Sequence, residues 1–198
     1  MTEPAASNRI LTVPNLISFV RLLAIPLFWW VLLVRDDVAL AAWILFIVGW
    51  TDWVDGYLAR RLNQVSELGR ILDPVADRLL IASALVGGLI AGVLPPWFGW
   101  GLIAREAVVG LVAIGLAARG GGAIEVRWLG KAATFALYGA IPAFYLAAAG
   151  ALEELMLPVA WGLGVVGLVL YWYTAILYIG DSRAKLAGLE STPHPEEV

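Results

Sequence analysis

Six long apolar stretches recur along the chain, and they constrain its fold more than any other feature. They occupy about residues 16–34, 39–59, 74–93, 97–118, 131–149 and 156–179. Each is close to the roughly 20 residues that a helix needs to cross a bilayer. With 61% hydrophobic and 15% charged residues, the chain is also more apolar than ordinary soluble domains. We therefore expect an all-α integral membrane protein with six transmembrane helices.

The basic residues of the connections are divided unequally between the two sides of the predicted membrane. Nine lie on the side of the N-terminus: Arg9, Arg60, Arg61, Arg70, Arg119, Arg127, Lys131, Arg183 and Lys185. Arg35 alone lies on the opposite side. Because Lys and Arg accumulate in cytoplasmic loops, we expect a multi-pass protein of the cell (inner) membrane, with both termini and the stretch from Asp52 to Asp77 facing the cytoplasm.

The sequence predicts one transmembrane domain and a polar tail. The domain is expected to cover residues 1–180. Residues 1–8 lack a basic start followed by a cleavable apolar core, so no removable signal peptide is expected. Residues 181–198 carry charges and two prolines without apolar periodicity, which predicts disorder.

Four aspartates stand near the cytoplasmic ends of the second and third predicted helices. Asp52 and Asp55 are three residues apart, and Asp73 and Asp77 are separated by one helical turn, so each pair shares a helix face. If the two helices face each other, four carboxylates converge, and such crowding requires a compensating cation. Magnesium or manganese prefers carboxylate oxygens, and two such ions about 4 Å apart can clamp the oxygens of a phosphoryl displacement. The pattern therefore predicts a two-metal site.

Two glycines and an arginine accompany these carboxylates. Gly56 and Gly69 would let a substrate approach the backbone closely, because a side chain there would obstruct it. Arg60 can offer a bidentate partner to a phosphate. Together with the aspartates, these residues indicate a diphosphate site at the cytoplasmic membrane surface.

Other interpretations of the acidic residues remain open. Asp73 directly precedes a proline, so it is also suited to cap the N-terminus of the third helix. Asp52 and Asp55 could form structural ion pairs with Arg60 and Arg78. A divalent-cation transporter is an alternative from another class of protein, although transporters tend to place their sites at the midplane between repeated halves, and the sequence has no internal repeat.

The spacing Asp-x-x-Asp-Gly-x-x-Ala-Arg, followed after eight residues by Gly-x-x-x-Asp-x-x-x-Asp, resembles the signature of the CDP-alcohol phosphotransferases. It is met by Asp52, Asp55, Gly56, Ala59, Arg60, Gly69, Asp73 and Asp77. The six predicted helices match the architecture of that family, so the resemblance covers about residues 9–180. It implies the fold of that family, with a polar active-site cavity open to the cytoplasm, and a homodimer.

The resemblance also implies an activity, namely transfer of a phosphatidyl group from CDP-diacylglycerol to an alcohol with release of CMP. By similarity, Asp52, Asp55 and Asp73 hold two divalent cations, Mg²⁺ or Mn²⁺. Asp77 completes the metal site and is the catalytic base that takes the hydroxyl proton of the acceptor.

The nucleotide site implied by the resemblance consists of Asp52, Gly56, Ala59, Arg60 and Gly69. The small residues would cradle the cytidine nucleotide, and Arg60 would meet its phosphates. The expected partners are therefore CDP-diacylglycerol, the acceptor alcohol and membrane lipids, and no nucleic acid.

Four further segments, TVPNLISFVRLLAIPLF, DPVADR, IARE and WLGKAAT, resemble the phosphatidylglycerophosphate synthase branch and its relatives, the CDP-diacylglycerol-dependent cardiolipin synthases. Glycerol-3-phosphate is the first expected acceptor, with Arg105, Lys131 and Arg127 as cations for its phosphate. Phosphatidylglycerophosphate synthases carry lysine where Arg78 and Ala133 stand here, and these departures favour phosphatidylglycerol, which gives cardiolipin. Cardiolipin synthesis is the second interpretation, and transfer to inositol phosphate is the third.

Overall fold

The structure is a computed structural model, and it describes most of the chain. Its backbone is described over residues 13–62, 67–121, 128–150 and 152–190. Side chains are described over residues 15–49, 51, 72, 75–121, 128–150 and 152–187.

Six helices make up the described backbone. They are α1 (Val13–Leu33), α2 (Val38–Leu62), α3 (Glu67–Ile90), α4 (Pro96–Ala118), α5 (Trp128–Ala148) and α6 (Glu153–Glu190). No strand occurs in the described ranges. Each helix contains nearly all of one predicted apolar stretch, so the predicted all-α fold with six helices is confirmed.

Two helices are longer than the sequence predicted. The third helix begins at Glu67, so Asp73 lies inside it and cannot be its N-cap. The last helix continues to Glu190, so the tail predicted to be disordered from residue 181 is helical over its first part. The physical reason is local: residues 183–190 include arginine, alanine, lysine, leucine and glutamate, which favour helix even without an apolar face. Ser182 also donates a hydrogen bond to the carbonyl oxygen of Tyr178 at 2.7 Å.

Three of the helices are long and apolar enough to cross a membrane. Within the described residues, the segments that meet both criteria are Asn15–Leu33, Pro96–Ala118 and Glu153–Ala187. Large apolar side chains on these helices are exposed, as at Leu111 and Ile114 of α4. An apolar surface of this kind is suited to contact with lipid chains rather than with water.

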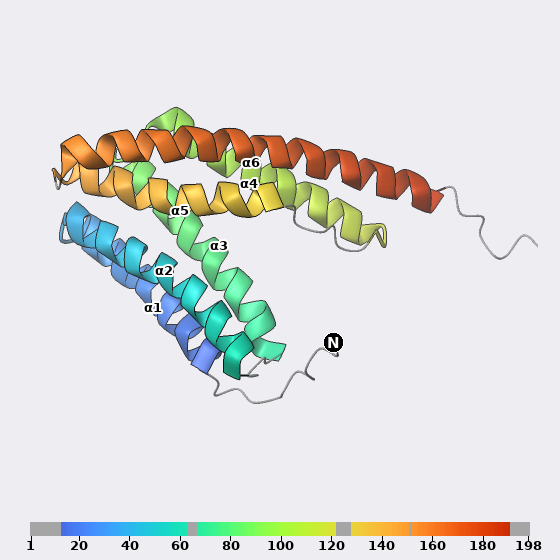
Figure 1. Cartoon of the computed structure of the whole chain (residues 1–198), viewed down its shortest axis with the longest axis horizontal. Coiled ribbons are helices and arrows are strands. Elements are labelled where there is room, and N and C mark those ends of the chain that lie inside the picture. Colours follow the sequence, from blue (N-terminus) through green and yellow to red (C-terminus); the bar gives the residue numbers. More distant parts are fainter. Residues whose placement is uncertain (1–12, 63–66, 122–127, 151, 191–198) are drawn as a thin grey trace, which may run out of the picture.

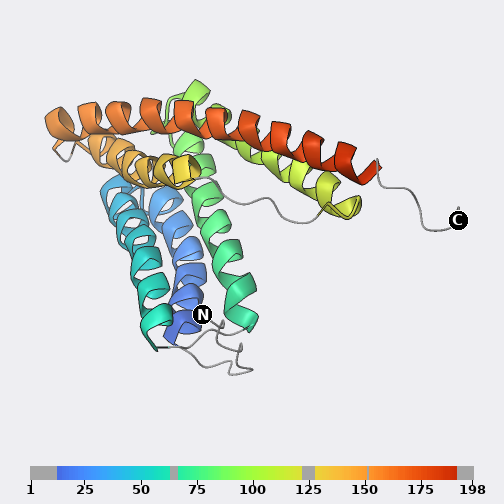
Figure 2. The same cartoon turned by 45° about the vertical axis from the view of Figure 1, so that its right-hand side comes forward.

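The helices form two groups of three that cross each other (Figures 1 and 2). In the first group, α1 packs against α2 and α3; in the second, α6 packs against α4 and α5. The groups meet where α3 contacts α4 and α5, and where α2 contacts α5. Residues that line the space between the groups therefore come from distant parts of the sequence.

The α3–α4 connection is tight because the carbonyl of Gly88 accepts two hydrogen bonds. The backbone N–H groups of Val93 and Leu94 donate to it at 2.8 and 3.0 Å. Gly92 has a φ of 68°, in the left-handed region that glycine adopts without strain at the end of a helix. Pro96 then opens α4, where its missing N–H costs nothing.

Close approach of α1, α3 and α5 builds the core beneath this connection. The ring of Phe28 lies 6.0 Å from that of Tyr145, measured between centroids. A Cβ atom added to Gly87 would lie 2.9 Å from a methyl carbon of Leu32, and one added to Gly88 would lie 2.6 Å from Leu94. A side chain at Gly87 would therefore collide with α1, and one at Gly88 would collide with the connection itself.

A tyrosine hydroxyl also joins α5 to α3 in this core. Tyr145 is fully buried, and its hydroxyl donates to the carbonyl oxygen of Ala84 at 2.7 Å. Replacing Tyr145 by phenylalanine should lower the free energy of unfolding by about 1 kcal/mol, which corresponds to a fall of about 2–4 °C in the thermal midpoint of a chain of this size. Thermal unfolding of the purified protein in detergent measures the shift.

Tyr173→Phe is the matched control, because Tyr173 lies on α6 and is about half exposed. It should leave the midpoint unchanged. Equal thermal midpoints for Tyr145→Phe and Tyr173→Phe would contradict a stabilising role for the hydrogen bond between Tyr145 and Ala84.

Candidate functional site

A cavity of about 780 Å³ lies between α3, α4, α5 and α6. Its charged lining residues are Asp77, Arg78, Arg105, Glu106 and Asp181. Its uncharged polar lining residues are Thr134, Tyr171, Thr174 and Tyr178. These side chains give the cavity a polar region inside an otherwise apolar group of helices.

The remaining wall of this cavity is apolar. It is formed by small and branched side chains of α3 and α4 and by two glycines, one of them on α5: Ile81, Ala82, Leu85, Val86, Ile103, Val109, Gly110, Ala113 and Gly130. A cavity that combines charged groups with an apolar wall suits an amphipathic molecule better than a fully polar one.

Asp77 is fixed at the edge of the cavity by a tyrosine from α5. The hydroxyl of Tyr138 donates a hydrogen bond to Oδ1 of Asp77. The ring of Tyr138 also packs on Gly49 of α2, where an added Cβ atom would lie 3.2 Å from the ring. Tyr138 therefore connects α2, α3 and α5 at the level of Asp77.

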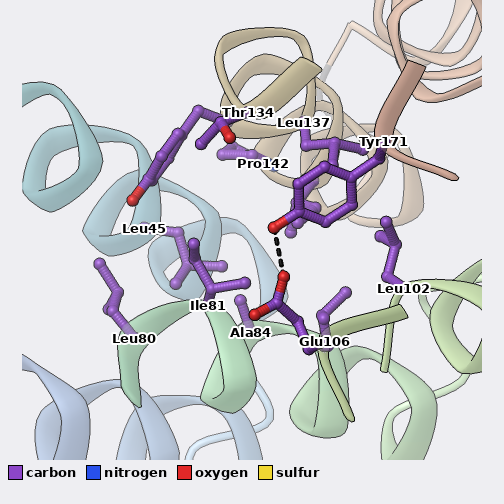
Figure 3. Close-up of a pocket in the computed structure, with 13 residues that line it drawn as sticks. Leu45, Leu80, Ile81, Ala84, Leu102, Glu106, Thr134, Leu137, Pro142 and Tyr171 are labelled. Carbon is purple, nitrogen blue, oxygen red and sulfur yellow. Dashed lines mark hydrogen bonds between the residues drawn. The ribbon is translucent and has the colours of Figure 1, made fainter. Parts of the chain in front are cut away.

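A smaller apolar pocket of about 40 Å³ adjoins the cavity (Figure 3). Glu106, Thr134 and Tyr171 line both spaces, whereas leucines, isoleucines and alanine from α2 to α5 form much of the inner lining. Figure 3 shows Glu106 and Tyr171 joined by a hydrogen bond at the wall of this pocket. They mark the junction between the polar cavity and the apolar interior.

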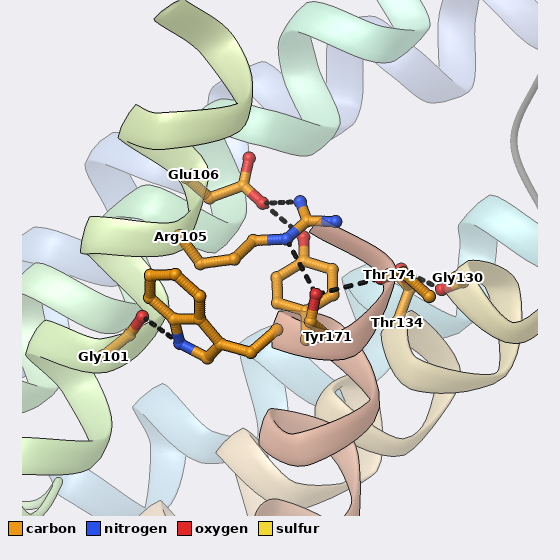
Figure 4. Close-up of polar contacts among 8 residues, drawn as sticks. Gly101, Arg105, Glu106, Gly130, Thr134, Tyr171 and Thr174 are labelled. Atoms are coloured by element: carbon orange, nitrogen blue, oxygen red, sulfur yellow. Dashed lines mark hydrogen bonds and ion pairs between the residues drawn. The ribbon is translucent and has the colours of Figure 1, made fainter. Parts of the chain in front are cut away.

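Arg105, Glu106 and Tyr171 form a compact network at that junction (Figure 4). The guanidinium of Arg105 donates from Nη1 to Oε1 of Glu106 at 2.8 Å and from Nε to the carbonyl oxygen of Tyr171 at 3.3 Å. Its Cζ atom lies 3.5 Å from the centre of the Tyr171 ring, a cation–π contact. The hydroxyl of Tyr171 donates to the same Oε1 atom. The network ties α4 to α6.

Comparison with known proteins identifies the class of protein to which this cavity belongs. The family model for CDP-alcohol phosphatidyltransferase matches residues 11–177, which is most of the chain. The chain belongs to the CDP-alcohol phosphatidyltransferase family. The resemblance stated from the sequence, and the enzyme class that it implied, are thereby confirmed.

Several curated relatives of this phosphatidyltransferase cover most of its length. It is 42% identical to a cardiolipin synthase (CMP-forming) from Streptomyces coelicolor, over 89% of this chain and 85% of the relative. It is 37% identical to a putative cardiolipin synthase from Mycobacterium tuberculosis, with the same coverage. A CDP-diacylglycerol–glycerol-3-phosphate 3-phosphatidyltransferase from Bacillus subtilis is 39% identical over 67% of this chain and 76% of its own. These names fit both the first and the second acceptor predicted from the sequence.

The predicted metal and nucleotide residues of the phosphatidyltransferase are only partly described. Asp77 lines the cavity. The other predicted side chains lie outside the described residues: Asp52, Asp55, Gly56, Ala59, Arg60, Gly69 and Asp73. Among the side chains that the structure describes, no three metal-ligating groups lie together. Convergence of the four carboxylates therefore stays a prediction.

The three residues predicted to bind the acceptor lie in different places relative to the cavity. Arg105 lines the cavity, although Glu106 and Tyr171 already hold its guanidinium. Lys131 is exposed and does not line the described cavity, which its neighbour Gly130 does. Arg127 lies outside the described residues.

Sequence reasoning overlooked the wall that α6 contributes. Tyr171, Thr174, Tyr178 and Asp181 all line the cavity, yet the sequence alone predicted no role for the first three and placed Asp181 at the start of the polar tail. A signal was present, because these residues follow one another at intervals of three, four and three. Such spacing places polar side chains on one face of a helix.

Proposed function

We propose that this phosphatidyltransferase transfers the phosphatidyl group of CDP-diacylglycerol to phosphatidylglycerol, giving cardiolipin and CMP. The cavity between α3 and α6 carries this proposal, because an apolar wall runs beside its charged residues. A lipid acceptor needs both environments: one for its glycerol headgroup and one for its acyl chains. The relatives named cardiolipin synthase support the same choice.

The charges that line the cavity also favour this acceptor. The described lining has three carboxylates, on Asp77, Glu106 and Asp181, against two arginines, Arg78 and Arg105. Of the arginines, Arg105 is already paired with Glu106. With Asp77 assigned to the proposed cations, Glu106 and Asp181 balance the two arginines, so the described lining has no surplus of positive charge to hold a doubly charged glycerol-3-phosphate.

Asp77 would act on the acceptor. A hydroxyl of the phosphatidylglycerol headgroup attacks the phosphorus that bears diacylglycerol, and its proton passes to the carboxylate of Asp77. The bond from this phosphorus to the bridging oxygen breaks, and CMP leaves with that oxygen. The hydrogen bond from Tyr138 fixes the orientation of the Asp77 carboxylate, so that it meets the hydroxyl without rearrangement.

Asp52, Asp55, Asp73 and Asp77 would hold two divalent cations, Mg²⁺ or Mn²⁺. When bound, these ions would neutralise the charge that develops on the phosphate oxygens. Three buried polar residues of α1 fit a polar site near these aspartates. Asn15, Ser18 and Arg21 are buried at intervals of three residues. The helices that α1 contacts are α2 and α3, which carry the aspartates.

The nucleotide half of the donor would lie over Asp52, Gly56, Ala59, Arg60 and Gly69. The match to the family signature supports this assignment. The excess of arginine and lysine on the N-terminal side supports an orientation with both termini and the site in the cytoplasm. The homodimer and the inner membrane location stay predictions.

Glycerol-3-phosphate is the second candidate acceptor. The Bacillus subtilis relative is named for that acceptor, and Arg78 and Arg105 both line the cavity. Transfer to it would give phosphatidylglycerophosphate by the same chemistry.

A parallel assay separates the two acceptors. Purified protein with magnesium would receive CDP-diacylglycerol and either labelled phosphatidylglycerol or labelled glycerol-3-phosphate. We expect release of CMP and labelled cardiolipin with phosphatidylglycerol. If the label appears only in phosphatidylglycerophosphate, the acceptor is glycerol-3-phosphate and not phosphatidylglycerol. Ion flux without release of CMP from either mixture would favour the transporter.

A further inference from the structure

Only one of the two carboxylate oxygens of Glu106 accepts hydrogen bonds from the described residues. Both of its hydrogen bonds with described residues, from Arg105 and from Tyr171, reach Oε1. Oε2 accepts no bond from the described part of the chain, and Figure 4 shows it turned away from that network. Glu106 lines both the main cavity and the small apolar pocket, and its side chain is 35% exposed.

The network holds this carboxylate in place. Arg105 is 13% exposed, and it is fixed to α6 by its bond to the backbone of Tyr171 and by its contact with the ring. The hydroxyl of Tyr171 donates a hydrogen bond to the same oxygen of Glu106. A group that is already ordered loses little conformational entropy when it binds a ligand.

The free oxygen defines the kind of ligand group that can bind. A carboxylate only accepts hydrogen bonds, so its partner must be a donor such as a hydroxyl. It repels a phosphate. Asp77 lines the same cavity from α3, the helix that contacts α4. We therefore infer that an acceptor that reacts at Asp77 with one hydroxyl offers a second hydroxyl to Glu106. A glycerol unit carries two hydroxyls on neighbouring carbons.

We propose that Glu106 selects acceptors that have a second hydroxyl beside the reacting one, by accepting a hydrogen bond from it at Oε2. Tyr171 is then a positioning residue that acts through Glu106. This inference rests on the proposed function, since it requires an acceptor alcohol. It holds equally for phosphatidylglycerol and for glycerol-3-phosphate, because both contain the same glycerol unit.

Paired acceptors test the proposal. One is phosphatidylglycerol, and the other is phosphatidyl-1,3-propanediol, which keeps the terminal hydroxyl and lacks the neighbouring one. The wild-type enzyme should prefer phosphatidylglycerol in kcat/KM by at least about tenfold, the effect of one hydrogen bond to a charged group. If glycerol-3-phosphate proves to be the acceptor, 3-hydroxypropyl phosphate is the corresponding analogue.

Glu106→Ala should bring the ratio of the two kcat/KM values close to one, mainly by lowering the value for phosphatidylglycerol. The ratio does not depend on the fraction of folded enzyme, so general damage to the fold leaves it unchanged. Tyr171→Phe keeps the ring beside Arg105 and removes only the hydroxyl, and it should give an intermediate ratio. Glu154→Ala and Tyr173→Phe, which lie on α6 outside the lining of the cavity, should keep the wild-type ratio.

Each contrary result has a distinct meaning. A wild-type enzyme that does not discriminate, or a Glu106→Ala variant that keeps the wild-type ratio, overturns the role of Glu106 and leaves the proposed function intact. If Glu106→Ala does not fold, an unchanged ratio for Tyr171→Phe overturns it. Wild-type protein that releases no CMP with any of these alcohols overturns both proposals.

Discussion

Replacing Asp77 by asparagine should reduce release of CMP by about 10²–10⁴-fold, which is the usual contribution of a general base. Asparagine has nearly the same shape, and its amide oxygen can still accept the hydrogen bond from Tyr138. The local packing should therefore survive. The amide cannot take the proton of the acceptor hydroxyl, so the attack on phosphorus should lose its base.

Single-turnover release of CMP, measured beside the binding of a CDP-linked substrate, checks this result. Donor binding should change much less than turnover. Asp36→Asn is the matched control, because Asp36 is exposed in the connection between α1 and α2. Its φ of 52° lies in a region that asparagine also tolerates. Turnover by Asp77→Asn at the rate of the control would exclude Asp77 as the base.

Removal of divalent cations should stop the reaction entirely, and added magnesium or manganese should restore it. The expectation follows from the proposed convergence of the four aspartates of α2 and α3, because that many like charges at close range would not remain ionised together without a cation. Titration of metal into chelator-treated protein, followed by CMP release, measures the requirement. Full turnover in the presence of excess chelator would contradict the two-metal proposal.

Asp52→Asn should raise the metal concentration for half-maximal activity by at least about tenfold, because even residues that only orient metal ligands typically contribute that much to affinity. Asp37→Asn is a suitable control, since Asp37 accepts a hydrogen bond from the backbone N–H of Leu40 at the start of α2, at the other end of that helix. An unchanged metal titration for Asp52→Asn would remove Asp52 from the set of ligands.

The number and approximate position of the helices were predictable because membrane-spanning helices require long apolar stretches. Their ends were less predictable. Glu67 starts α3 before its apolar stretch begins, and α6 continues well beyond the end of its own. Hydropathy marks the part of a helix that lies in lipid, whereas helix propensity and hydrogen bonds decide where the helix stops.

The family was predictable because one short segment carries its signature. The aspartates of α2 and α3 lie within a single stretch of sequence, and their spacing alone indicated the family, whereas the metal site that they suggest stays a prediction. The Arg105–Glu106–Tyr171 network was not predictable in this way, because Tyr171 lies 66 residues from Arg105 and contacts it only after α4 and α6 have packed. Contacts between distant helices are set by tertiary packing, which local patterns do not report.

The length of α6 bears on how this protein can be shortened or fused to another. A helix of 38 residues is about 57 Å long, whereas the hydrocarbon layer is only about 30 Å thick. The helix therefore continues beyond its apolar stretch, where Asp181 lines the cavity and Ser182 is buried. Cutting the gene where hydropathy ends would delete part of the binding wall. A reporter or affinity tag belongs after Glu190.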